Sequence, residues 1–210
     1  MENYSVLMSV YYKEQAENLR EAIDSILNQT VKTNEFIIVK DGPLTEKLDN
    51  TIKEYVEEYP GVFKIVTLKK NMGLAKALNK GIEQCSNEII ARMDSDDISM
   101  PDRMERQLEA MEANRADILS GTIVEFDESV DKPTAKRELP EKNEQIIEFA
   151  KKRSPFNHPA VMFKKSDVIK AGSYMDFHGF EDYYLWLRML SGGMKGYNLS
   201  EVLVYMRVGN

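Results

Sequence analysis

Short apolar runs alternate with amphipathic segments through the first half of the chain, and this alternation limits the possible folds more than any other feature. The apolar runs cover residues 5–10, 36–39, 63–68 and 88–93, and each has the length of a buried strand. Strands that alternate with helices form a mostly parallel sheet covered on both faces, so we expect an α/β fold. The helices between and after these strands are expected over residues 19–27, 48–59, 74–82 and 104–111.

The alternation stops near residue 116, and the second half of the chain is expected to form an α+β extension of the same sheet. No repeat or low-complexity linker interrupts the 210 residues. The sequence therefore predicts a single domain over residues 1–210, with one half at 1–115 and the other at 116–210. Its second half should contain a strand at 118–126, a polar loop at 127–143, a helix at 144–151, a strand at 160–163, a turn near Gly172, a helix at 181–190 and a last strand at 202–206.

Charge and cysteine content exclude several classes of function. The formal net charge is −7, which makes the chain a poor general binder of nucleic acid or anionic membranes. Cys85 is the only cysteine, so an internal disulfide and a Cys-rich zinc site are ruled out. No secretory signal and no apolar run of roughly 20 residues is found in the sequence. We expect a cytoplasmic protein, with any membrane association peripheral.

Polar and aromatic residues follow each of the four strands expected in the first half. In open α/β sheets, ligands bind in the crevice beyond the carboxyl ends of the strands, so four loops should converge on one site. Asp41 with Gly42 could also form a plain turn, but its place at a strand end favours the site. The residues in question are Tyr11 and Tyr12, Asp41 and Gly42, Asn71 and Gly73, and Asp94, Ser95, Asp96 and Asp97.

Three carboxylates lie within four residues directly after the fourth strand. Asp94, Asp96 and Asp97 repel one another there, and a divalent cation is the usual compensation. Few protein ligands are offered, which suits Mg²⁺ or Mn²⁺ shared with a diphosphate. An EF-hand is excluded because its sixth position would be Ser99 instead of glycine. Helix capping explains Ser99 and Asp102 but neither Asp94 nor Asp96.

Several segments together resemble a known enzyme family. In order and spacing, they are SVLMSVYYKE, VKDGPLT, KNMGLAKALNKGI, ARMDSDD, NHPAVMFKK and FEDYYLWLRM. They are similar to the family 2 glycosyltransferases of the GT-A fold, and the likeness is closest to bacterial enzymes that build exopolysaccharide or capsule repeat units. The resemblance covers nearly the whole chain. It implies a Rossmann-like half that binds a nucleotide-sugar at residues 1–115 and an acceptor-binding half at residues 116–210.

The resemblance also implies which residues bind the nucleotide of a UDP-sugar donor. Tyr11 would lie beside the base, and Asp41 would accept a hydrogen bond from the uracil edge. Asn71 and Gly73 would border the nucleotide, and Lys76 would offset phosphate charge.

A second group of residues is implied for the metal and the ribose. Asp94 resembles the residue near the ribose, with Ser95 next to it, and Asp96 resembles the ligand of a Mn²⁺ or Mg²⁺ ion that bridges the diphosphate. Asp97 would be a third carboxylate. His158 could contact the phosphate or the metal, or it could be a structural histidine.

Catalysis in such a site requires a base for the acceptor hydroxyl, because the cation already activates the leaving group. The resemblance assigns this role to Asp182, with Glu181 beside it, and a single in-line displacement would invert the anomeric centre. Both carboxylates could instead only stabilise the start of a helix. Trp186 shares a helical face with Asp182 and could form the floor of the acceptor site or pack in the core. His178, in a turn, is expected on the acceptor side or at the surface.

The chain departs from the family pattern at several positions. Relatives often have Pro at the position of Ser9, Asn at that of Tyr12 and Asp at that of Lys40. The Gln-x-x-Arg-Trp element of processive synthases is absent, so we expect one sugar to be transferred each time an acceptor binds. Many relatives continue past the position of Asn210, where further residues would complete the acceptor site or contact a membrane.

Two other functions remain open from the sequence. A sugar-phosphate nucleotidyltransferase also combines an α/β sheet, a nucleotide and a metal, but its Gly-rich, Arg-containing loop after the first strand has no counterpart in SVYYKE. A non-catalytic nucleotide-sugar-binding module would keep the fold and transfer nothing. The acceptor is expected to be a saccharide or a lipid-linked saccharide.

Overall fold

The first half of the chain folds into the parallel part of a sheet. The computed structural model describes residues 3–177 and 179–209. Its first strands are β1 (Tyr4–Val10), β2 (Glu35–Lys40), β3 (Phe63–Thr67) and β4 (Ile89–Asp94). They lie in the order β3-β2-β1-β4, and all neighbouring pairs are parallel. The predicted α/β fold with a mostly parallel sheet is confirmed, and His178 lies outside the described residues.

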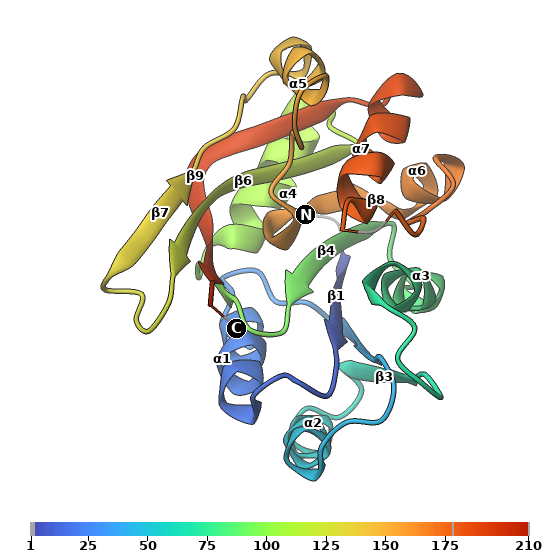
Figure 1. The fold of residues 1–210 in the computed structure, drawn as a ribbon, viewed down its shortest axis with the longest axis vertical. Helices are drawn as coiled ribbons and strands as arrows, with labels where there is room; N and C mark the ends of the chain where they lie inside the picture. The colour runs from blue at the N-terminus through green and yellow to red at the C-terminus, as the bar shows by residue number, and fades with distance from the viewer. Residues whose placement is uncertain (1–2, 178, 210) are drawn as a thin grey trace.

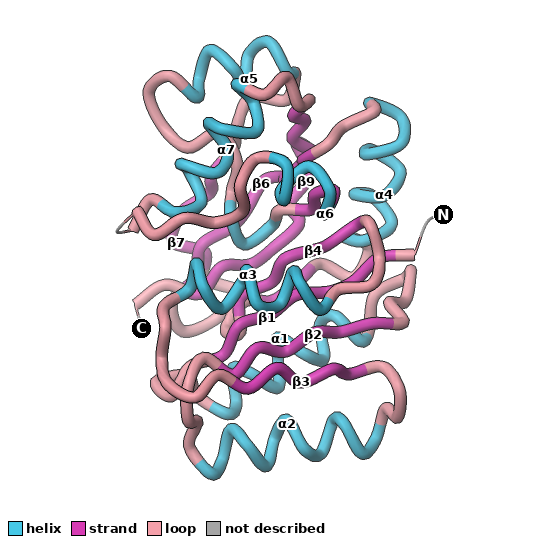
Figure 2. Tube along the Cα trace, turned by 90° about the vertical axis from the view of Figure 1, so that its right-hand side faces the viewer, coloured by secondary structure: helices cyan, strands magenta, loops and turns pink. Residues whose placement is uncertain are grey.

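Helices cover both faces of this sheet (Figures 1 and 2). Side chains alternate along a strand, so Val6 and Met8 of β1 face one core and Leu7 faces the other. The first core is completed by α1 (Ala16–Leu27), α2 (Glu46–Glu58) and α4 (Arg103–Asn114), and the second by α3 (Leu74–Gln84), α5 (Asn143–Ala150) and α7 (Glu181–Ser191). Within the described ranges, no helix is both long and apolar enough to cross a membrane.

The second half extends the same sheet, mostly with antiparallel neighbours. Strand β8 (Met162–Lys164) lies antiparallel to both β4 and β6 (Ile118–Phe126). Strand β9 (Gly196–Arg207) runs parallel to β6 and pairs with the short β5 (Ile98–Ser99). Among the residues that the structure describes, these strands and β7 (Pro133–Arg137) complete one nine-stranded sheet that runs through both halves.

Three elements of the second half differ from the sequence-based expectation. The polar loop expected over residues 127–143 contains β7, which pairs antiparallel with β6, and all five of its residues are exposed. A strand without a buried face has no apolar alternation, so the pattern could not predict it. Strand β9 begins at Gly196, whereas the sequence pattern predicted its start at residue 202. The exposed Ser200 and Glu201 interrupt the apolar run, so the pattern did not reveal the first part of the strand. Helix α6 (Lys165–Lys170) was not predicted, because six residues are too few to show helical periodicity.

Candidate active site

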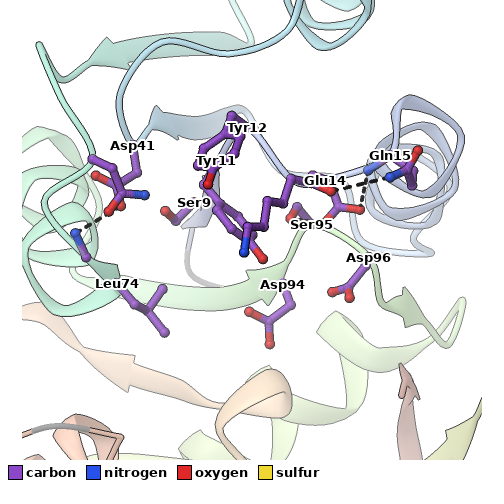
Figure 3. A pocket seen from close by; sticks show the side chains of 13 residues that line it. Ser9, Tyr11, Tyr12, Glu14, Gln15, Asp41, Leu74, Asp94, Ser95 and Asp96 are labelled. Carbon is purple, nitrogen blue, oxygen red and sulfur yellow. Dashed lines mark hydrogen bonds between the residues drawn. The ribbon is translucent and has the colours of Figure 1, made fainter. Parts of the chain in front are cut away.

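The loops after the four parallel strands surround a cavity of about 860 Å³, which we call the first cavity (Figure 3). Most of the residues expected to bind the nucleotide or metal lie around it, whereas Lys76, Asp97 and His158 lie outside its lining. Lys76 is exposed on the first turn of α3. The lining consists of Ser9, Tyr11, Tyr12, Lys13, Glu14, Gln15, Asp41, Asn71, Gly73, Leu74, Asp94, Ser95 and Asp96.

Asp41 joins the loop after β2 to the loop before α3. Its carboxylate accepts hydrogen bonds from the backbone N–H groups of Met72, at 2.7 Å, and Gly73, at 3.1 Å. Gly42 allows the two loops to approach closely: it has a φ of +91°, and a Cβ there would lie 2.5 Å from the backbone nitrogen of Asn71. The position therefore requires glycine. Asp41 is only 4% exposed, and its two hydrogen bonds hold this wall of the first cavity in place.

Lys40, which stands where relatives often have Asp, does not enter the first cavity's lining. Its ammonium group lies 2.5 Å from a carboxylate oxygen of Asp49 on α2. This ion pair directs the side chain toward the helix. The departure from the family pattern thus leaves Asp41 in place at the cavity.

Two tyrosines form an aromatic wall of the first cavity. Tyr11 is 43% exposed and Tyr12 is 51% exposed, and their rings meet edge to face with centroids 5.9 Å apart. The free faces of these exposed rings can stack on a planar ligand.

Glu14 connects the loop after β1 with the loop after β4. Its carboxylate accepts a hydrogen bond from the Ser95 hydroxyl at 2.7 Å and another from the Gln15 backbone N–H at 2.8 Å, next to the start of α1. Ser95 is buried, so its hydroxyl is committed to this contact. Glu14 was not among the residues expected at the site, although it is the last residue of the segment SVLMSVYYKE.

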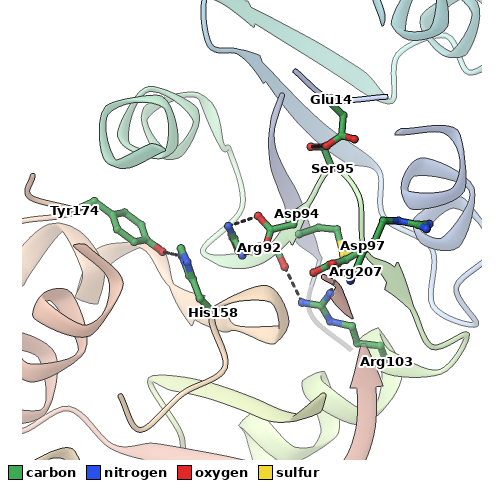
Figure 4. Close-up of polar contacts among 10 residues, drawn as sticks. Glu14, Arg92, Asp94, Ser95, Asp97, Arg103, His158, Tyr174 and Arg207 are labelled. Carbon is green, nitrogen blue, oxygen red and sulfur yellow. Dashed lines mark hydrogen bonds and ion pairs between the residues drawn. The ribbon is translucent and has the colours of Figure 1, made fainter. Parts of the chain in front are cut away.

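A buried arginine pairs with Asp94. Arg92 precedes Asp94 by two residues in β4, which places both side chains on one face of the strand. The Arg92 guanidinium donates two hydrogen bonds to the Asp94 carboxylate and is only 2% exposed. In Figure 4 Arg92 lies between Asp94 and His158. Arg92 was not among the residues expected at the site, although a charged residue inside an apolar strand indicates a buried partner.

Asp97 turns away from the first cavity. It is 1% exposed, and one oxygen of its carboxylate accepts a hydrogen bond from the Arg207 backbone N–H of β9 at 2.8 Å. Burial raises the pKa of Asp97 well above its ordinary value, and the negative charges of Asp94 and Asp96 raise it further. This position suits a group that joins β9 to the loop after β4.

Of the three carboxylates that follow the apolar run of β4, Asp94 and Asp96 line the first cavity, and Figure 3 shows them on either side of Ser95. Across residues 3–177 and 179–209, no three His, Cys, Asp or Glu side chains are grouped closely enough to hold a metal ion by themselves. Two carboxylates at a wide cavity leave coordination positions open for the oxygens of a ligand, which is how Mg²⁺ and similar ions bind beside phosphates. The residues present therefore fit a divalent cation that is shared with a phosphorylated ligand.

Asp182 lines another cavity of about 510 Å³, which we call the second cavity. It is half-buried at the start of α7, where Glu181 accepts a hydrogen bond from the Gly179 backbone N–H at 3.1 Å. Burial raises the pKa of Asp182, and the Tyr183 backbone N–H and the positive charge of Arg92 partly oppose this rise. A carboxylate with a raised pKa is a stronger base than an exposed one.

His158 also borders the second cavity, and thus lies apart from Asp94 and Asp96. One of its ring nitrogens is 3.0 Å from the Tyr174 hydroxyl. Burial and then the charge of Arg92 lower the pKa of His158 well below its ordinary value, so the ring is neutral. Trp186 packs edge-on against His158, Tyr174 and Phe156 and has no exposed surface, which makes it a core residue.

Sequence comparisons identify the family to which this architecture belongs. The model of glycosyl transferase family 2 matches residues 5–174. The amylovoran biosynthesis glycosyltransferase AmsE of Erwinia amylovora is 45% identical over 208 residues, which cover 99% of this chain and 77% of that protein. The UDP-Gal:alpha-D-GlcNAc-diphosphoundecaprenol beta-1,3-galactosyltransferase of Escherichia coli is 42% identical over 205 residues, or 97% of this chain and 74% of that protein.

Solved structures agree with the assignment at the level of the fold. S. aureus TarS 1–349 in complex with UDP-GlcNAc has a TM-score of 0.77 at 16% identity, over 99% of this chain and 59% of that chain. The mannosyltransferase PcManGT from Pyrobaculum calidifontis, in complex with GDP-Man and Mn²⁺, has a TM-score of 0.75 at 15% identity, over 100% of this chain and 58% of that chain. The chain thus spans less than two thirds of either solved chain.

The match to the family model and the identity to relatives confirm the resemblance found in the sequence, and they leave no support for a nucleotidyltransferase. The chain belongs to glycosyl transferase family 2 and is a glycosyltransferase of the GT-A fold.

Proposed function

We propose that the chain transfers one sugar residue from a UDP-sugar to a saccharide or lipid-linked saccharide during synthesis of a bacterial cell-surface polysaccharide. The reaction inverts the anomeric centre and requires Mn²⁺ or Mg²⁺. The observation that carries this proposal is a first cavity at the carboxyl ends of the parallel strands together with a second cavity that contains Asp182. One is lined by carboxylates and aromatic rings, and the other contains a half-buried carboxylate whose pKa is raised.

The first cavity would bind the nucleotide of the donor. Tyr11 and Tyr12 offer exposed rings for the base, and Asp41 lies at the end of the adjacent strand, where it fixes the loop of Asn71 and Gly73 beside the ligand. Relatives support a UDP-sugar: one is named for transfer from UDP-Gal, and TarS has been solved with UDP-GlcNAc.

Asp94 and Asp96 would hold the divalent cation, which supplies positive charge to the diphosphate and so makes it a better leaving group. Asp94 is already fixed by Arg92, which orients its carboxylate before any ligand arrives. Asp97, turned toward β9, supports this loop without contacting the ligand. The solved complex of PcManGT with GDP-Man and Mn²⁺ supports the presence of a cation in this fold.

Asp182 would act as the general base in a single displacement. The acceptor hydroxyl oxygen forms a bond to the anomeric carbon, and its proton passes to the Asp182 carboxylate. The bond from the anomeric carbon to the diphosphate oxygen breaks, and its electron pair leaves with UDP. Attack and departure occur on opposite faces of the sugar, so the configuration inverts. Glu181 holds the turn before α7 and thereby positions Asp182.

Within one domain of residues 1–210, the half at 1–115 would bind the donor and the half at 116–210 the acceptor.

We propose a cytoplasmic enzyme that visits its acceptor at the membrane. The segment before α7 supports a peripheral contact, because Met175, Phe177 and Phe180 are 42%, 55% and 58% exposed. No nucleic-acid partner is proposed for a chain with a net charge of −7.

Calorimetric titration of UDP with and without Mn²⁺ tests the donor site. UDP should bind the wild type much more tightly when Mn²⁺ is present, and Asp96→Ala should remove this dependence. Asp97→Asn is the matched control: it neutralises the neighbouring carboxylate, which is not in the cavity lining, and should keep the dependence. Equal UDP affinity with and without metal in the wild type would refute the cation. Titrations of dTDP and GDP test the choice of nucleotide.

A further inference from the structure

The end of β9 holds the backbone of the loop that carries Asp94 and Asp96. Arg207, the last residue of β9, contacts two consecutive residues of this loop. Its backbone N–H donates a hydrogen bond to the Asp97 carboxylate at 2.8 Å, and its guanidinium Nε donates one to the Asp96 backbone carbonyl at 3.1 Å. Figure 4 shows Arg207 next to Asp97. The two bonds join residues that are 110 and 111 positions apart, so the fold brings them together.

The guanidinium of Arg207 is itself fixed in place. It lies over the ring of Phe126, 4.6 Å from the centroid, and Phe126 is the residue opposite Arg207 in the pairing of β6 with β9. Another of its nitrogens forms an ion pair with Glu21 of α1 at 2.6 Å, and the side chain is only 12% exposed. A guanidinium presents several N–H donors in one rigid plane, so it can hold the Glu21 carboxylate and the Asp96 carbonyl at the same time.

The carbonyl that Arg207 holds belongs to the peptide bond between Asp96 and Asp97. These neighbours face opposite ways: Asp96 lines the first cavity, whereas Asp97 is 1% exposed and faces β9. Rotation of the peptide between them would change which carboxylate faces the cavity. The hydrogen bond from Arg207 opposes this rotation, and β5, which begins directly after Asp97, pairs with β9 as well.

The two residues before Asp96 are held by other partners. Arg92 donates two hydrogen bonds to the Asp94 carboxylate, and the Ser95 hydroxyl donates one to Glu14. Arg207 therefore acts at a different point of the loop from Arg92 and Glu14.

We infer that Arg207 is a positioning residue for the divalent cation: it fixes the peptide after Asp96 so that the Asp96 carboxylate stays at the first cavity. Arg207 is not part of the lining of that cavity, so it acts through Asp96 and not on the donor directly. This inference rests on the proposed cation site. Residues that orient metal ligands typically change the affinity for the metal by about 10–100-fold when they are replaced.

Calorimetric titration of UDP, without metal and at one fixed concentration of Mn²⁺, tests the role of Arg207. Arg207→Met removes the guanidinium but keeps the backbone N–H that binds Asp97. The gain in UDP affinity that Mn²⁺ provides should shrink about tenfold in Arg207→Met, because Asp96 remains but is no longer held. The affinity for UDP without metal should stay at the wild-type value, which a general loss of structure around the cavity would not allow.

Arg188→Met is the matched control. Arg188 of α7 also stacks on an aromatic ring, that of Tyr184 at 4.7 Å, and donates a hydrogen bond to a backbone carbonyl, that of Ser173 at 2.7 Å. It is part of the lining of neither cavity, so its loss should leave the gain from Mn²⁺ unchanged. Urea unfolding of both variants shows whether their losses of stability are comparable.

Arg207→Lys provides the test if Arg207→Met does not fold. Lysine keeps the positive charge near Glu21 but lacks the planar set of donors, so the gain from Mn²⁺ should shrink by a smaller factor. A wild-type gain in the folded Arg207 variant, or an equal reduction in Arg188→Met, would overturn the inference. No gain in the wild type would contradict the proposed cation site and the inference with it, whereas a gain in the wild type that Arg207→Met retains in full would contradict the role of Arg207 alone.

Discussion

Replacement of Arg92 by methionine removes the buried positive charge that pairs with Asp94. The methionine keeps most of the apolar contacts of the arginine stem, so the change acts mainly on charge. Arg92 is 2% exposed, whereas the Asp94 side chain is 32% exposed. Removal of one partner from a fully buried ion pair costs about 3–5 kcal/mol. Because water can still reach Asp94, we expect Arg92→Met to lower the free energy of unfolding by about 2–3 kcal/mol.

Urea unfolding followed by the fluorescence of the single tryptophan, Trp186, measures this loss, because Trp186 is fully buried in the native state. The double variant Arg92→Met/Asp94→Asn should recover part of the stability, since the uncompensated carboxylate is gone. Arg20→Met is the matched control. It breaks an ion pair with Glu54 in which both side chains are exposed, and such pairs contribute less than about 1 kcal/mol.

Unfolding measured in the presence of ligands distinguishes the electrostatic explanation from a simple loss of packing. With Arg92 absent, a divalent cation bound by Asp94 would replace the missing positive charge, so saturating UDP and Mn²⁺ should stabilise Arg92→Met by more than they stabilise the wild type. The reasoning would be refuted if Arg92→Met lost no more stability than Arg20→Met. It would also be refuted if the ligands stabilised the variant and the wild type equally.

Two more predictions concern the cavity wall and the base. Gly42→Ala should destabilise the chain by about 2 kcal/mol more than Gly61→Ala in urea unfolding: both glycines have positive φ, but only at position 42 would the new Cβ meet backbone atoms, and equal losses would contradict this. The kcat should fall with decreasing pH as Asp182 becomes protonated, with a midpoint above the ordinary aspartate value because burial raises its pKa. In Arg92→Met the midpoint should move higher still, because the opposing positive charge is gone; an unchanged pH profile would exclude this coupling.

The parallel half of the fold was predictable because β1, β2 and β4 are buried on both faces, and β3, although only partly buried, keeps an apolar run. An apolar run such as that of β1 is then visible without knowledge of its neighbours. The opposite case is β7, whose five exposed residues pair with β6 through the backbone alone. Pairing through the backbone alone does not require an apolar alternation, so the sequence of β7 does not indicate a strand. Strand β9 is intermediate, because a polar bulge divides one long strand into a visible and an invisible part.

The candidate site was predictable where a residue directly follows a strand. Tyr11 and Asp41 directly follow β1 and β2, Asp94 is the last residue of β4, and all three line the first cavity. The position of a side chain relative to its loop could not be predicted, and Asp97 is the example: it lies one residue from Asp96 yet faces β9.

Contacts between residues that are far apart in the sequence also could not be predicted. The contact of Glu14 with Ser95 joins residues that are 81 positions apart. The second cavity combines β7, the end of α5 and the start of α7, and no local motif connects these three segments.

Turnover by Asp182→Asn tests the central claim, that the first cavity binds the donor and Asp182 performs the transfer. The donor is chosen as the nucleotide-sugar from which the wild type releases nucleotide, among UDP-, dTDP- and GDP-linked sugars, and Glu181→Gln is the control at the adjacent carboxylate. We predict that Asp182→Asn binds UDP and Mn²⁺ as the wild type does, while its kcat falls by about 10²–10⁴-fold, and that Glu181→Gln keeps most activity. Unchanged turnover by Asp182→Asn, or a loss of its UDP binding, would contradict the account.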